Sequence, residues 1–93
     1  MAGTARTIRS ADEGAERERV RTAAMADLAR ARRSLSAAQA ALAGRARALY
    51  TGSHDADPQT LREGALLAHR DVERARVDLD IILAAAESLG ARP

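Results

Sequence analysis

The feature that most constrains the fold is a seven-residue repeat of leucine in the first half of the chain. Leu28, Leu35, Leu42 and Leu49 follow this spacing, and a second apolar series runs from Leu61 to Leu89 in alternating steps of four and three. Apolar positions that recur about every 3.5 residues indicate helices that pack along a shared seam. The predicted seam consists of Leu28, Leu35, Leu42, Leu49, Leu61, Val72, Leu79 and Ile82, with smaller residues between them.

Helix start and stop signals divide the chain. Ser10 and Glu13 fit a capping box, Gly52 can supply a left-handed C-terminal residue, and Asp57-Pro58 is an N-cap followed by proline at the first helical position. We therefore predict a flexible basic tail over 1–9, a helical hairpin over 10–90 and a tail over 91–93. Within the hairpin, the first helix covers about 10–50, the loop 51–57 and the second helix about 58–89, stopped by Gly90.

The two seams are complementary when the helices are antiparallel. If facing residues have numbers that sum to 110, Leu42 meets Ala68, Val72 meets Ala38, and Leu28 meets Ile82. Setting large residues against alanine allows close interdigitation. The predicted fold class is all-α: an antiparallel two-helix coiled-coil hairpin that assembles into a four-helix bundle or docks on a larger partner.

Composition limits how stable this hairpin can be alone. The chain has 93 residues, of which 24 are alanine, and all 15 basic residues are arginine, a bias typical of a bacterium with a high-GC genome. Two alanine-rich helices bury little apolar area, and scaffolds of this size rarely stand without further packing. We expect a partner surface from the exposed apolar and small residues: Leu66, Leu67, Val77, Ile81, Ala37, Ala40 and Gly44.

Residues that could carry chemistry are sparse. The tripeptide Ser53-His54-Asp55 cannot form a hydrolytic triad, because that geometry requires separate segments. His54 and Asp55 with Asp57 are a weak metal signal, and Tyr50 is expected to close the hairpin end. The absence of cysteine excludes thiolate zinc sites and disulfides. We predict no enzyme activity, no cofactor and no metal.

Charge is distributed unevenly. Residues 1–50 carry ten arginines against five carboxylates, and 51–93 carry five against eight. The predicted register sets Arg32 and Arg76 on one side as a candidate basic edge, while Asp27, Asp71 and Asp78 lie on the other. An alternative function is nucleic-acid binding through phosphate contacts. Its candidate residues are Arg17, Arg21, Arg32, Arg33 and Arg76.

At the predicted bend stands Tyr50-Thr51-Gly52. A helical hairpin with an aromatic-x-glycine at its bend resembles the W-x-G family of small type VII secretion substrates, although a tyrosine replaces the tryptophan. The resemblance implies a dimerising hairpin exported by Gram-positive bacteria.

The hypothesis that we favour is a non-enzymatic protein-protein interaction module, either a homo-oligomer or a small accessory subunit. The start of the chain lacks a Sec-type signal pattern. The longest charge-free stretch, 34–44, is too short to cross a bilayer. We therefore expect a cytoplasmic protein without membrane insertion.

Overall fold

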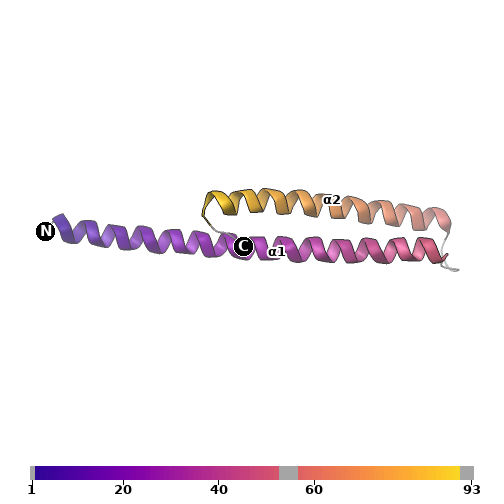
Figure 1. The fold of residues 1–93 in the computed structure, drawn as a ribbon, viewed down its shortest axis with the longest axis horizontal. Helices are drawn as coiled ribbons and strands as arrows, with labels where there is room; N and C mark the ends of the chain where they lie inside the picture. The colour runs from indigo at the N-terminus through magenta and orange to yellow at the C-terminus, as the bar shows by residue number, and fades with distance from the viewer. Residues whose placement is uncertain (1, 53–56, 91–93) are drawn as a thin grey trace.

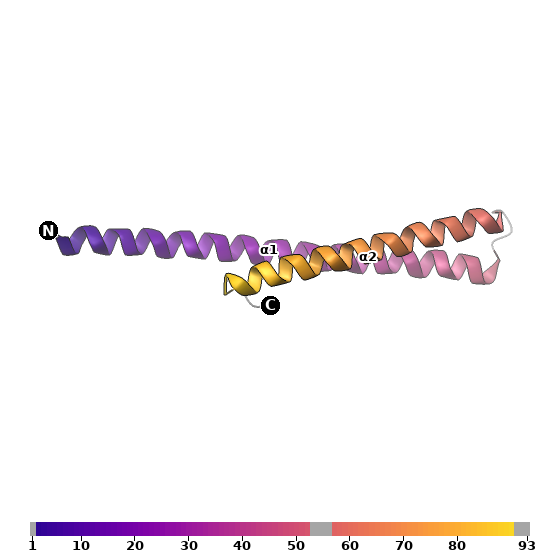
Figure 2. The same ribbon diagram turned by 90° about the horizontal axis from the view of Figure 1, so that it is seen from above.

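The chain folds into two helices that lie antiparallel, side by side. The computed structural model describes the backbone of residues 2–52 and 57–90, and their side chains from residue 11 onward. In these ranges helix α1 spans Ala2–Thr51 and helix α2 spans Pro58–Ser88. Both views show α2 running back along the second part of α1 (Figures 1 and 2). The fold is thus an all-α helical hairpin, 79 Å long and 16 Å in each other dimension.

Helix α1 is much longer than its partner. It begins at Ala2, so residues 2–9 continue the helix, in contrast to the predicted tail, and Ser10 lies inside the helix and does not cap it. The segment contains no proline, and its alanines and arginines favour helix, so propagation outweighs the capping signal. The N-terminal part of α1 therefore projects beyond the end of α2 (Figure 1).

The predicted boundary residues lie at the helix ends. Gly52 has φ of 65° and Gly90 has φ of 77°, the left-handed conformation that a residue without Cβ adopts at little cost. Asp57 is the N-cap of α2 with extended backbone, and Pro58 occupies the first helical turn. The Asp57 carboxylate makes no capping hydrogen bond. The Asp57 carbonyl oxygen accepts the first hydrogen bond of the helix, from the Leu61 amide at 3.0 Å. Ser53–Ala56 and 91–93 lie outside the described residues.

The contact between the helices is built from leucine, valine and alanine. Leu28 is 1% exposed and Val72 is 5% exposed, and the other buried residues of the described chain are alanines. Alanine at these positions lets the backbones approach closely, because its methyl group leaves room for a large side chain opposite. Leu35, Leu42, Leu61, Leu79 and Ile82 are half-buried.

The contact becomes weaker toward the bend. Leu49 has the same heptad spacing as Leu28 yet is 39% exposed, whereas its neighbour Ala48 is half-buried. In an α-helix each seven-residue step falls about 20° short of two full turns, and only a supercoil corrects this drift. After three heptads Leu49 has rotated away from α2, so the leucine spacing overstates its burial.

Candidate protein-protein interface

The outer face of α2 exposes large apolar side chains. Ile81 is 62% exposed, Val77 54%, Leu66 65% and Leu67 59%. Ile81 follows the buried Val72 by nine residues, about two and a half turns, and therefore lies on the opposite side of the helix. Val77 stands in the same relation to buried Ala86. These four residues, named the α2 outer face below, have no partner within the described hairpin.

The outer face of α1 is smooth. Ala37, Ala40 and Gly44 are all exposed, and a Cβ added at Gly44 would meet no atom within 4 Å. Gly44 follows half-buried Leu35 by nine residues, and Ala37 follows buried Leu28 by nine, so both point away from α2. We name these three residues the α1 outer face.

The predicted partner surface is therefore two surfaces on opposite sides of the hairpin. A four-helix bundle made from two hairpins needs one apolar side to which both helices contribute. The residues predicted from sequence do not provide such a side. The structure places Leu66, Leu67, Val77 and Ile81 on one helix and the small residues on the other.

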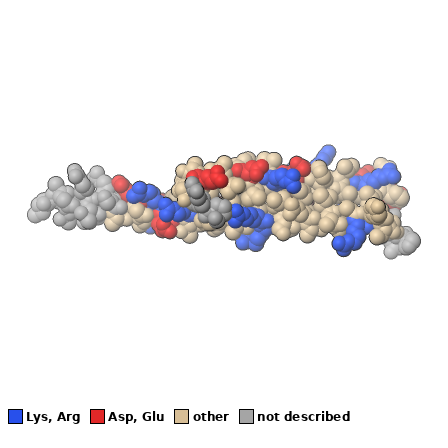
Figure 3. Space-filling view, viewed as in Figure 1, with Lys and Arg blue, Asp and Glu red and all other residues tan. Residues whose placement is uncertain are grey.

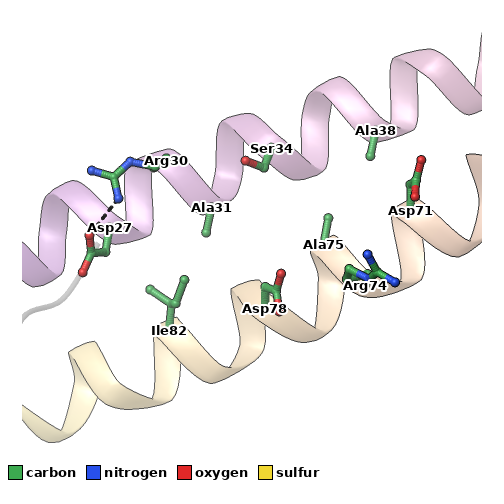
Figure 4. Close-up of a pocket in the computed structure, with 10 residues that line it drawn as sticks. All are labelled: Asp27, Arg30, Ala31, Ser34, Ala38, Asp71, Arg74, Ala75, Asp78 and Ile82. Carbon is green, nitrogen blue, oxygen red and sulfur yellow. Dashed lines mark hydrogen bonds and ion pairs between the residues drawn. The ribbon is translucent and has the colours of Figure 1, made fainter.

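A shallow groove of about 390 Å³ runs along one flank between the helices (Figure 4). Its floor is formed by Ala31, Ala38 and Ala75, whose side chains are too short to fill the space between the backbones. Charged residues line its walls, and Arg30 Nη1 donates to Asp27 Oδ1 at 3.1 Å. The complete lining is Asp27, Arg30, Ala31, Ser34, Ala38, Asp71, Arg74, Ala75, Asp78 and Ile82.

The groove brings together the three aspartates expected on the acidic flank. It also contains Arg30 and Arg74, which were not predicted to lie on the acidic flank. The signal for both was present, since Arg30 is three residues after Asp27 and Arg74 is three after Asp71, and residues at this spacing share a helix face. The groove is consequently of mixed charge.

The arginines of the described residues are exposed, and two in the first part of α1 are paired with glutamates. Arg32 and Arg76 are exposed and do not line the groove. Arg19 Nη2 contacts Glu16 Oε2 at 2.6 Å, and Arg21 Nη1 contacts Glu18 Oε2 at 3.4 Å. Along the paired part of the hairpin, Figure 3 shows arginines on α1 and both carboxylates and arginines on α2, with the carboxylates concentrated toward its C-terminal end.

The hairpin has more surface than a compact protein of its mass. Its accessible area is 7291 Å², whereas a globular monomer of 9.8 kDa has about 5,200 Å². The difference, roughly 2,000 Å², exceeds the about 800 Å² that each partner buries in an interface of standard size.

Two titratable side chains lie near each other on α2. His69 Nε2 lies 3.8 Å from Glu73 Oε1, and both side chains are largely exposed. No three histidine, aspartate or glutamate side chains among the described residues are placed to hold a metal ion, and His54 and Asp55 fall outside those residues. Tyr50 is 95% exposed, so it does not close the hairpin end as predicted.

Neither helix, over the residues described, combines the length and apolarity needed to cross a membrane. No family model matches the chain, and no curated protein or solved structure is significantly similar to it. The resemblance to the W-x-G family accordingly stays a prediction.

Proposed function

We propose that this protein is a non-enzymatic protein-protein interaction module, a homo-oligomer or a small accessory subunit, that binds through the α2 outer face. The observation that carries the proposal is the exposure of Leu66, Leu67, Val77 and Ile81 on one helix, each more than half exposed. Exposed apolar surface marks interaction sites on proteins. Here it consists of two patches, Leu66 with Leu67 and Val77 with Ile81, because Arg70, Glu73 and Arg74 lie between them on the same side of α2.

The energetics support association. Fully burying a valine, leucine or isoleucine side chain contributes about 1.5–3 kcal/mol, and Val77 and Ile81 lie one turn apart, so one partner surface can cover both. The hairpin interior offers few comparable contributions, because its buried residues other than Leu28 and Val72 are alanines. A binding event at the α2 outer face would therefore add substantially to the stability of the fold.

The experiment compares two variants by light scattering after size-exclusion chromatography at micromolar concentration. Val77→Glu/Ile81→Glu should reduce the assembly to a monomer and leave helical circular dichroism unchanged, because both positions are solvent-exposed in the hairpin. The matched control is Tyr50→Glu, which adds a carboxylate at an exposed aromatic residue outside the α2 outer face and should assemble normally. Retained assembly of the double variant would contradict the proposed surface, and a wild-type chain that stays a well-folded monomer would contradict the homo-oligomer and leave the accessory subunit.

A second candidate function is nucleic-acid binding by α1. Residues 28–51 contain five arginines and no carboxylate, a distribution that suits phosphate contacts. Against it, Arg21 is paired with Glu18, and no described aromatic side chain other than Tyr50 could stack on a base. A gel shift at low salt that shows no complex would dispose of this candidate.

A further inference from the structure

The two outer faces are complementary in size. On α2, Val77 and Ile81 project from the helix as exposed β-branched side chains. On α1, Ala37, Ala40 and Gly44 present a surface without projecting side chains, with open space above Gly44. Large side chains that pack onto small ones allow two helices to approach closely. The buried residues inside the hairpin show the same combination of sizes, since among the described residues they are Leu28, Val72 and three alanines.

The two faces are also complementary in charge. Residues 28–51, which contain the α1 outer face, have five arginines and no carboxylate. On α2 the excess of carboxylates lies around Val77 and Ile81: residues 77–88 have three carboxylates and no arginine, whereas residues 66–76, which contain Leu66 and Leu67, have three arginines against two carboxylates. Opposite charges around an apolar contact favour one partner and orientation over others.

We infer that the α2 outer face of one copy docks on the α1 outer face of a second copy. This inference rests on the proposed function and names its partner and its mode. A symmetric contact of α2 with α2 would place two carboxylate-rich segments against each other, which like-charge repulsion disfavours. The contact of α2 with α1 instead joins an acidic segment with projecting apolar side chains to a basic segment whose outer face consists of alanine and glycine.

Because the two faces lie on opposite sides of the hairpin, this contact is heterologous. Each copy that is bound through its α2 outer face still offers its α1 outer face to the next copy. Head-to-tail contacts of this type produce rings when the rotation closes and open stacks when it does not. The assembly therefore contains more than two copies.

The test uses two variants that each block one face. Val77→Glu/Ile81→Glu blocks the α2 outer face, and Ala40→Gln/Gly44→Gln blocks the α1 outer face by size alone. Glutamine is a good helix former, and no neighbouring atom restricts a side chain at Gly44, so the second variant should fold. Ala11→Gln/Ala15→Gln is its control, with comparable added bulk at exposed positions in the projecting part of α1, about six turns before Ala37.

Sedimentation velocity should show each blocked variant as a monomer and the control as large as wild type. An equimolar mixture of the two blocked variants should form a 1:1 dimer, because one intact face remains on each chain. If the Ala40→Gln/Gly44→Gln variant assembles like wild type, or the mixture stays monomeric, the head-to-tail contact is refuted. The proposed function would survive that result, provided that Val77→Glu/Ile81→Glu still abolishes assembly. A wild-type chain that is monomeric throughout refutes both the head-to-tail contact and the homo-oligomer, and leaves only the accessory subunit.

Discussion

Truncating two leucines that share one heptad spacing should have unequal effects on stability. Leu28 is 1% exposed and Leu49 is 39% exposed, although both belong to the same seven-residue repeat of leucine. Replacing a buried leucine by alanine costs about 2–5 kcal/mol. We expect Leu28→Ala to cost about 2–3 kcal/mol, in the lower part of that range because only one helix packs against it. Leu49→Ala should cost about 1 kcal/mol, since much of its side chain is already in water.

The assay is urea unfolding followed by helical circular dichroism, with all variants at the same protein concentration. For an m-value of about 1 kcal/mol per molar urea, the midpoint should fall by about 2–3 M for Leu28→Ala and by about 1 M for Leu49→Ala. Both substitutions replace leucine by alanine within α1, so helix propensity changes equally and cancels in the comparison. Equal losses would refute the reasoning, because they would mean that Leu49 packs as tightly as a regular supercoil requires.

The other predictions concern glycines and surface charges. Gly64→Ala should raise the free energy of unfolding by about 0.5–1 kcal/mol, because the new Cβ would lie 3.5 Å from Arg45 Nη1, an ordinary contact. Gly52→Ala should lower it by about 1–2 kcal/mol, because φ is 65° there; urea midpoints that move in the same direction for both would contradict this pair. Glu16→Gln removes an ion pair whose side chains are 70% and 63% exposed, so thermal unfolding should change by less than about 1 kcal/mol. A larger loss would show that the pair orders the projecting helix.

Much of the hairpin could be predicted from sequence. The seam spacing and the signals at Gly52, Asp57 and Pro58 indicated two antiparallel helices, and the structure has them. The start of α1 could not be predicted, because a capping box competes with a segment of strong helix formers and no local pattern decides between them. The exposure of Leu49 was also not predicted, because the rotation of a seam away from its partner depends on how far the two helices supercoil.

The candidate partner surface was predicted as one surface, whereas the structure divides its residues between two sides of the hairpin. Apolar residues outside the seam indicated Val77 and Ile81, but they were grouped with Ala37, Ala40 and Gly44 as one surface. The nine-residue distance from each to a seam position would have separated them, because nine residues are about two and a half helical turns. The groove on the flank was harder to predict, since its width depends on how closely Ala31, Ala38 and Ala75 bring the backbones together.

The central claim is that this hairpin self-associates. Sedimentation equilibrium of the unmodified chain over a concentration range from nanomolar to about 100 micromolar tests it most directly, because it measures mass without labels or substitutions. If the hairpin self-associates, its weight-average mass should rise with concentration to a multiple of 9.8 kDa. A mass that stays at 9.8 kDa throughout, with cooperative unfolding and full helicity, would contradict it.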